Sequence, residues 1–300
     1  KSAVAIGKFD GIHLGHRKLI DNMLEQKKNG CLAVVFTFEP SPEKFFRGKE
    51  AKELMTIEEK RTAFERLGID VLIEFPLNKE TAAIAPERFI TEYLIGKLKA
   101  TVVVAGTDIS FGNKGAGNAG LLREMAQEEG FFAQIIDKVT WNGEEISSTL
   151  IREAVRNGDM EKASALLGAP YRICGEVVNG RRFGRKLGMP TVNQQPSADK
   201  LLPPNGVYYS YVWLDNVCYR SVSNVGCKPT VSEERLMGVE TYIYDFDSDI
   251  YGRKIEVELL RFKRAEIEFA STEALKEQMR KDIDEGMAFH HTFNQGTKEG

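Results

Sequence analysis

The feature that most constrains the fold is a regular alternation of short apolar runs with helically spaced segments in the first half of the chain. Apolar runs of strand length cover residues 3–6, 31–38, 71–75, 101–105 and 131–136. Between them lie helical spacing at residues 17–28 and 121–129, the capping box Thr56-Ile57-Glu58-Glu59, and Pro86 as a helix start. Strands that alternate with helices predict a parallel sheet with helices on both faces, whose ligands bind beyond the carboxyl ends of the strands.

The second half has a different character, because helical spacing gives way to short β-rich runs. These runs cover residues 171–178, 207–214, 217–225, 240–246 and 255–262. Asp215-Asn216, between two of the runs, is a hairpin signal. Many short strands separated by glycine and proline predict a small closed antiparallel barrel. A final helix begins near Ser271, and its apolar stripe is expected to pack on the barrel.

The break between the two patterns is Gly168-Ala169-Pro170, which follows two predicted helices at residues 149–156 and 160–167. We therefore predict an α/β domain over residues 1–168 and a β-barrel domain with a C-terminal helix over residues 169–300. The length of 300 residues accommodates two domains of about 100–200 residues each.

Composition narrows the classes of protein to which the chain can belong. Hydrophobic residues make up 42% and charged residues 28%, and the formal net charge of −3 offers no basic field for nucleic acid or an anionic membrane. No apolar run approaches the ~18–20 residues that span a bilayer, and no secretory signal is visible. The four cysteines form no C-x-x-C pair. We predict reduced thiols, no zinc site and a cytoplasmic location.

The first apolar run leads directly into the stretch Gly7-Lys8-Phe9-Asp10-Gly11-Ile12-His13-Leu14-Gly15-His16. It predicts a glycine-rich turn and a helix start, where free backbone N–H groups and the helix dipole favour a phosphate group. Two histidines three residues apart share one helix face and can place imidazole N–H donors on phosphate oxygens. The stretch therefore favours nucleotide binding over a purely structural turn. It is neither a Walker loop nor a dinucleotide fingerprint.

Three further stretches follow a predicted strand or open a predicted helix, at residues 37–42, 106–112 and 146–152. The last of these is Ile146-Ser147-Ser148-Thr149-Leu150-Ile151-Arg152, which places hydroxyl groups at a helix start and an arginine one turn later. Such a segment either only caps the helix or grips a polyphosphate through N–H, O–H and guanidinium groups. Taken alone, its residues favour the two interpretations equally.

Gly-x-Phe-Asp-Gly-x-His-x-Gly-His, followed about 130 residues later by Ile-Ser-Ser-Thr-x-x-Arg, resembles the bacterial bifunctional riboflavin kinase/FAD synthetase family and, more distantly, the nucleotidylyltransferase superfamily. Matches in the second half follow the order of the same family: Gly175-Glu176-Val177-Val178-Asn179-Gly180, Gly184 to Asn193 with Pro190-Thr191-Val192-Asn193, Asn224-Val225-Gly226, Val239-Glu240-Thr241 and Ile250-Tyr251-Gly252. The resemblance covers almost the whole chain. It implies a nucleotidylyltransferase-like (Rossmann-like) α/β domain followed by a kinase barrel.

For the second domain, the resemblance implies that ATP phosphorylates the ribityl 5′-hydroxyl of riboflavin and gives FMN. Glu240 would accept the hydroxyl proton, and Thr191 and Asn193 would offer oxygen ligands to Mg²⁺. The other implied residues are Gly180, Gly184, Lys186 and Gly188, which with Thr191 would bind the nucleotide, and Arg264, which with Asn193 would contact the flavin.

For the first domain, the resemblance implies that the FMN phosphate attacks the α-phosphate of a second ATP, giving FAD and pyrophosphate. The nucleophile is already an anion, so catalysis would depend on alignment and on stabilising spread-out negative charge. The implied catalytic residues are His13, His16 and Arg152, and Asp108 is an implied flavin contact. The implied nucleotide-binding residues are Gly7, Phe9, Asp10, Gly11, Ser148 and Thr149.

Two other functions are alternatives. The chain could be an adenylyltransferase for another phosphorylated acceptor, or a non-catalytic nucleotide-binding sensor. The motifs of the second half favour the flavin kinase over the first of these, and an assay of flavin products separates it from the second. The expected partners are ATP, riboflavin, FMN and FAD, with no nucleic acid and no membrane, and we expect a monomer or a weak homo-oligomer.

Overall fold

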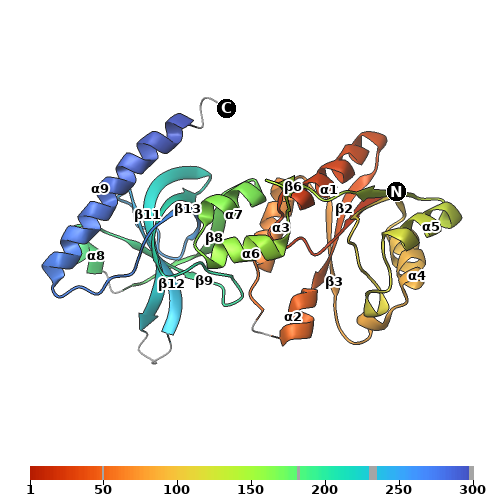
Figure 1. The fold of residues 1–300 in the computed structure, drawn as a ribbon, viewed down its shortest axis with the longest axis horizontal. Helices are drawn as coiled ribbons and strands as arrows, with labels where there is room; N and C mark the ends of the chain where they lie inside the picture. Colours follow the sequence, from red (N-terminus) through yellow and green to blue (C-terminus); the bar gives the residue numbers. More distant parts are fainter. Residues whose placement is uncertain (49–50, 181–182, 230–234, 297–300) are drawn as a thin grey trace. The chain divides into compact units, whose positions relative to one another are not determined.

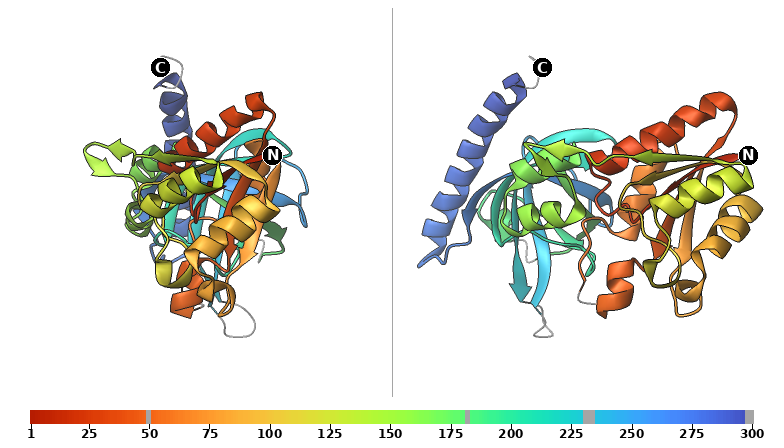
Figure 2. Two further views of the ribbon diagram at one scale, coloured as in Figure 1. Left: turned by 90° about the vertical axis from the view of Figure 1, so that its right-hand side faces the viewer. Right: turned by 45° about the vertical axis from the view of Figure 1, so that its right-hand side comes forward.

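The computed structural model describes residues 1–48, 51–180, 183–229 and 235–296 (Figures 1 and 2). The chain divides into two compact units, Lys1–Ser148 and Thr149–Gly300. The predicted fold class is confirmed in both: the first unit contains a five-stranded parallel sheet with helices, and the second contains a closed antiparallel barrel followed by a long helix.

The sheet of the first unit has the strand order β3-β2-β1-β4-β5. Its strands are β1 (Ser2–Ile6), β2 (Leu32–Glu39), β3 (Val71–Pro76), β4 (Ala100–Gly106) and β5 (Phe132–Ile136). The helices are α1 (Leu14–Glu25), α2 (Pro42–Arg47), α3 (Ile57–Arg66), α4 (Pro86–Arg88) and α5 (Ala119–Glu129), with the shorter turns η1 (Gln26–Asn29), η3 (Thr81–Ala83) and η5 (Asn113–Gly115). β2 and β3 lie on one side of β1, and β4 and β5 lie on the other. The carboxyl end of β1 is therefore a topological switch point, where ligands of such sheets bind.

Apolar side chains cover both faces of this sheet. Met23 of α1 and Phe64 of α3 pack on one face, and Phe89 and Leu122 pack on the other. This two-sided burial explains why the strands are continuous apolar runs, and all five lie within two residues of their predicted bounds. The Thr56 capping box is also confirmed. The helix that Pro86 opens continues as a π-helix, η4 (Phe89–Lys97), instead of the expected α-helix.

The second unit opens with two helices and closes its sheet into a barrel. Its elements are α6 (Ser148–Arg156), α7 (Met160–Leu167), β8 (Tyr171–Val178), α8 (Phe183–Lys186), β9 (Val192–Pro196), β10 (Gly206–Leu214), β11 (Val217–Pro229), β12 (Arg235–Ile243), β13 (Lys254–Ala265) and α9 (Thr272–Gly296). The barrel order is β10-β11-β12-β9-β8-β13. Asp215 and Asn216 both have positive φ, which confirms the predicted hairpin between β10 and β11.

The strands of this part of the chain differ from the prediction at two places. β9 was not predicted, and the strand expected at residues 240–246 lies earlier, at Arg235–Ile243.

The compact units divide after residue 148, and the domain boundary predicted after residue 168 stays a prediction. The units divide at residue 148 because α7 packs on β8 and β13, with an ion pair between Glu161 and Arg261, so the two helices group with the barrel.

The barrel also contains a buried chain of hydroxyl groups. Ser210 lies between Ser221 and Ser223, and Ser223 continues to Thr241, with 2.8 Å between successive oxygens. All four side chains are fully buried. These hydrogen bonds link β10, β11 and β12 through their side chains, in addition to the backbone ladder.

The C-terminal helix α9 lies on the outside of the barrel, as expected (Figure 1). The Tyr244 hydroxyl donates to the Ile283 carbonyl at 2.5 Å, and His290 is fully buried with Nε2 3.1 Å from the Ser221 carbonyl oxygen. Within the described ranges, no helix has the length and apolar character needed to cross a membrane.

Candidate active sites

The loop between β1 and α1 makes a tight turn at the carboxyl edge of the sheet. Phe9, Gly11 and Ile12 all have positive φ, at 50°, 88° and 44°. At Gly7 a β-carbon would lie 3.1 Å from the Phe9 ring, so a larger residue would crowd the turn. The turn ends at His13, which is the N-cap of α1, so both histidines lie at the helix start as the sequence predicted.

His13 and His16 stack on each other, with ring centroids 3.7 Å apart and planes 20° from parallel. His13 Nδ1 accepts a hydrogen bond from the backbone N–H of His16 at 3.3 Å. A neutral His13 must therefore carry its proton on Nε2, which makes that atom a hydrogen-bond donor.

Both imidazoles are held neutral by their surroundings. Burial lowers the pKa of His13 to about 4, although the nearby Asp108 carboxylate acts in the opposite direction. Burial also lowers the pKa of His16 well below its usual value, and the charges of His13 and Lys60 lower it further. At neutral pH the pair therefore offers N–H dipoles and no net positive charge.

This neutrality predicts a dependence of stability on pH. Between about pH 6.5 and pH 4 the unfolded chain binds a proton at His13 that the folded protein does not bind, so stability falls as the pH falls through this range. For His13 alone the loss is about 2 kcal/mol between pH 7 and pH 5. Urea unfolding followed by circular dichroism at the two pH values measures it. The variant His13→Asn keeps a good N-cap but does not titrate, so it should lose less stability, and an unchanged pH dependence would contradict the prediction.

Two residues of the loop have structural contacts that the sequence did not reveal. The Asp10 carboxylate accepts hydrogen bonds from the backbone N–H groups of Leu54 and Met55, at 3.3 and 3.2 Å. Phe9 is fully buried, and its ring packs on the rings of Phe64 and His16. Both side chains serve to fix the loop, so a nucleotide contact at Phe9 would have to use its backbone.

One hydroxyl of the serine- and threonine-rich segment contacts the same loop. Ser148, the last residue of the first compact unit, donates from Oγ to the Asp10 carbonyl oxygen at 2.8 Å. Thr149 follows it, and Arg152 is buried one turn further along α6; both belong to the second compact unit. Asp108 lies just beyond β4, where its exposed carboxylate is 3.7 Å from the Lys138 ammonium and close enough to influence His13.

A second group of predicted residues meets in the barrel. Glu240 of β12 pairs in register with Asn193 of β9 and Asn224 of β11, so the three side chains form one row across neighbouring strands. The Thr191 hydroxyl donates to Glu240 Oε1 at 2.6 Å. A carboxylate, a hydroxyl and amide groups therefore gather at one point on the barrel.

Two glycines are required by the close approach of the chain to this row. A β-carbon at Gly180 would lie 2.3 Å from the Asn193 amide nitrogen, and one at Gly184 would lie 2.4 Å from the Met189 carbonyl oxygen and 2.9 Å from Thr191 Oγ1. Gly188 has a positive φ of 77° with open space around it. The side chain of Lys186, a predicted nucleotide contact, lies outside the described residues.

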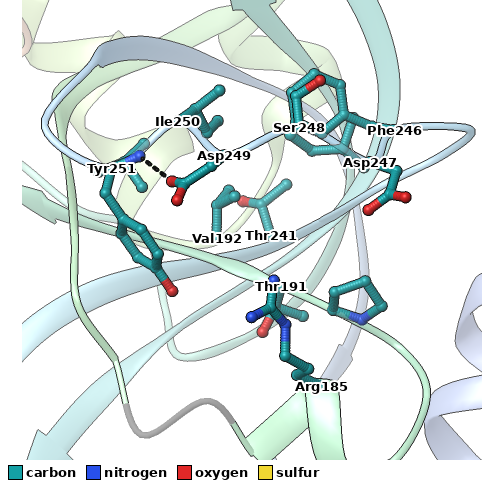
Figure 3. Close-up of a pocket in the computed structure, with 13 residues that line it drawn as sticks. Arg185, Thr191, Val192, Thr241, Phe246, Asp247, Ser248, Asp249, Ile250 and Tyr251 are labelled. Carbon is teal, nitrogen blue, oxygen red and sulfur yellow. Dashed lines mark hydrogen bonds between the residues drawn. The ribbon is translucent and has the colours of Figure 1, made fainter.

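Thr191 lines two cavities. The larger is about 640 Å³, a size that suits a small-molecule ligand, and it extends from Glu240 to an apolar wall. That wall includes Val207, Ile267, Phe269, Leu275, Met279 and Ile283. The smaller cavity, about 120 Å³, is shown in Figure 3, where Arg185, Asp247, Ser248, Asp249 and Tyr251 surround it with polar groups.

Arg264 lines the larger cavity, but its guanidinium is already engaged. Nε and Nη2 donate to the buried Asp282 carboxylate of α9, at 3.0 and 2.5 Å. Arg264 therefore ties α9 to β13, and a flavin contact would have to be made alongside this ion pair.

The sequence missed several residues of these sites. Leu275, Met279 and Ile283 were expected only to pack on the barrel, yet they form a cavity wall. Asp247 and Asp249 gave no signal, because loop carboxylates are common at protein surfaces. Considering the polar residues after each predicted strand end would have identified Asp247 and Asp249 as candidates.

The oxygen donors beside Glu240 suit a hard cation. Thr191 donates its hydroxyl proton to Glu240, which leaves the hydroxyl oxygen as a possible metal ligand, and the Asn193 amide lies in the same row. Hydroxyl and amide oxygens, together with phosphate and water, are typical Mg²⁺ ligands. The residues thus fit the predicted Mg²⁺.

Comparison with known proteins gives matches to both halves of the chain. A family model described as FAD synthetase matches residues 1–150, and a model described as riboflavin kinase matches residues 167–290. Two curated proteins named bifunctional riboflavin kinase/FMN adenylyltransferase are similar over nearly the full length. The protein of Bacillus subtilis is 36% identical, covering 96% of this chain and 92% of its own, and that of Escherichia coli K12 is 34% identical, covering 93% and 90%.

A solved structure has the same fold over both units. It is described as a macrolide-efflux protein from Streptococcus pneumoniae and has a TM-score of 0.84 at 29% identity, covering 95% of this chain and 93% of the other.

Proposed function

The chain belongs to the bifunctional riboflavin kinase/FMN adenylyltransferase family, and we propose that it converts riboflavin to FMN in the barrel and FMN to FAD at the edge of the parallel sheet. The observation that carries this proposal is the meeting of Thr191 and Glu240 where the two cavities of the barrel adjoin. Both family models that match this chain describe flavin enzymes, and neither describes an efflux protein.

In the kinase reaction, the larger cavity holds riboflavin, with its ring system on the apolar wall and its ribityl chain toward Glu240. The Glu240 carboxylate accepts the proton of the 5′-hydroxyl, and the hydrogen bond from Thr191 orients that carboxylate. The new bond joins the 5′-oxygen to the γ-phosphorus of ATP, and the bond from that phosphorus to ADP breaks. The smaller cavity, together with Gly180, Gly184 and Gly188, holds the nucleotide.

Mg²⁺ is proposed to bind at Thr191 and Asn193. When bound, it neutralises charge on the transferring phosphates. Gly184 lies close to Thr191 and Gly180 lies close to Asn193, so the backbone at both glycines runs next to the proposed Mg²⁺ ligands.

In the adenylyl transfer, an FMN phosphate oxygen attacks the α-phosphorus of ATP, and the bond to pyrophosphate breaks. The neutral His13 and His16 donate hydrogen bonds to phosphate oxygens at the start of α1, where the helix dipole favours negative charge. The loop around Gly7 and Gly11 provides close backbone approach. Ser148, Thr149 and Arg152 are proposed to hold the polyphosphate, and Asp108 to lie near the flavin.

The alternatives are not favoured. A transferase for another phosphorylated acceptor would not explain the riboflavin kinase match over residues 167–290, and a non-catalytic sensor would not explain the Glu240 and Thr191 pair beside a ligand-sized cavity. We also propose a cytoplasmic location and only small-molecule partners. The net charge of −3 offers no basic field for nucleic acid or an anionic membrane, which supports the second of these. Sedimentation of the purified chain tests the expected monomer or weak homo-oligomer.

One assay tests the proposed function directly. The purified chain is incubated with riboflavin, ATP and Mg²⁺, and the flavins are separated by chromatography over time. FMN should accumulate first and FAD should follow. A second reaction that starts from FMN isolates the adenylyl transfer. Folded protein that forms neither flavin product would overturn the proposal.

A further inference from the structure

Lys60 is a buried lysine that none of the sequence motifs includes. It lies in α3, one turn after the capping residue Thr56, and its side chain is only 1% exposed. Lysine is among the residue types that are almost never fully buried without a charged or hydrogen-bonded partner, because removing an ammonium from water costs several kcal/mol. Its burial therefore calls for an explanation.

Two contacts hold the start of α3 against the histidine loop. The Asp10 carboxylate binds the backbone N–H groups of Leu54 and Met55, immediately before the helix. Phe64 packs on Phe9 with ring centroids 5.6 Å apart, and Phe9 packs on His16 at 5.2 Å. Lys60 is four residues before Phe64, on the same face of α3. The lysine therefore faces the loop that carries the histidine pair, at the carboxyl edge of the sheet.

No charged side chain is paired directly with the Lys60 ammonium in the described part of the chain. Its charge acts on the Glu39 carboxylate at the end of β2, and the neighbouring Glu53 pairs with the Lys44 ammonium at 3.3 Å. Over the described ranges of the chain, no hydrogen bond or ion pair engages the Lys60 ammonium, and Glu39 Oε2 is buried without a hydrogen bond. The charge of Lys60 acts on Glu39 and on His16, but from beyond ion-pair distance.

We propose that the Lys60 ammonium is a phosphate-binding group of the adenylyl transfer site, completed by a phosphate oxygen of ATP or of FMN. The proposal rests on the proposed function of the histidine pair. It adds a positive charge to a site whose imidazoles are neutral, in a reaction that brings two phosphorylated substrates together. A charge in a partly buried site interacts with a phosphate far more strongly than it would in water.

The variant Lys60→Met tests this, because methionine keeps most of the apolar stem and removes the charge. Activity starting from FMN should fall about 100-fold in kcat/KM. Riboflavin kinase activity of the same chain, at the separate barrel site, should stay within about 2-fold. The exposed lysine variant Lys97→Met is the matched control and should leave both activities unchanged.

Two further measurements identify the phosphate and exclude a merely structural role. If the ammonium meets the triphosphate, the KM for ATP rises and calorimetry shows weaker pyrophosphate binding; if it meets FMN, the KM for FMN rises and pyrophosphate binding is unchanged. Because the variant removes an unpaired buried charge, the ligand-free protein should have an equal or higher Tm.

A lower Tm, together with adenylyl transfer kinetics within about 3-fold of the wild type, would overturn the proposal. So would an equal loss of both activities. Failure of the proposed function itself is distinguishable, since the wild type would then form no FAD from FMN.

Discussion

Replacing Glu240 with glutamine is expected to lower the kcat for FMN formation about 1000-fold, while FAD formation from FMN continues at the wild-type rate. The amide has the shape of the carboxylate, and its oxygen can still accept the hydrogen bond from Thr191. It cannot take the proton of the ribityl hydroxyl, so the loss reflects the missing base. Initial rates measured separately from riboflavin and from FMN give the two activities.

The variant Glu273→Gln is the matched control, because Glu273 is an exposed carboxylate in the first turn of α9. It should leave both rates unchanged. If Glu240→Gln still formed FMN at more than about a tenth of the wild-type rate, Glu240 would not be the base.

Replacing His16 with alanine should have the reverse effect. We expect FAD formation from FMN to fall about 100- to 1000-fold, as is typical when one preorganised donor to a developing negative charge is removed. FMN formation from riboflavin should continue. His16 is a better test than His13, because His13 also caps α1 and its loss would disturb the helix start.

The chain contains four histidines, and His291 provides the control for this variant. His291 is exposed on α9, so His291→Ala should leave both activities intact. A folded His16→Ala protein that lost both activities together would contradict the assignment of the two reactions to separate sites.

The elements predicted well from the sequence are those whose pattern of apolar and polar residues follows directly from which faces are buried. The strands of the parallel sheet are buried on both faces and so are continuously apolar. β9 was missed because it is polar: Gln194 is buried only because its amide donates to the Ile173 and Ile255 carbonyls of β8 and β13. These hydrogen-bond acceptors lie far from Gln194 in the sequence, so no local pattern predicts that Gln194 is buried.

The candidate sites show the same division. The position of the two histidines at a helix start could be predicted, because a glycine-rich turn follows the first strand. Glu240 and Thr191 were expected from the family resemblance alone, and the structure brings them within hydrogen-bond distance. The contacts of Asp10 could not, since its hydrogen-bond donors are 44 and 45 residues away. Lys60 also gave no signal, because a lysine within a charged helix normally indicates a solvated face.

The buried hydroxyl chain of the barrel limits how this part of the enzyme can change during evolution. Ser221 and Thr241 lie at the two ends of this hydroxyl chain, so exchanging Ser210 or Ser223 for alanine removes the hydrogen bond of a buried end hydroxyl, which costs about 1–3 kcal/mol. Exchanging all of them for apolar residues of similar shape carries no such penalty. The four positions should therefore change together among descendants of this chain. Each such change would include Thr241, which is the neighbour of the proposed base Glu240.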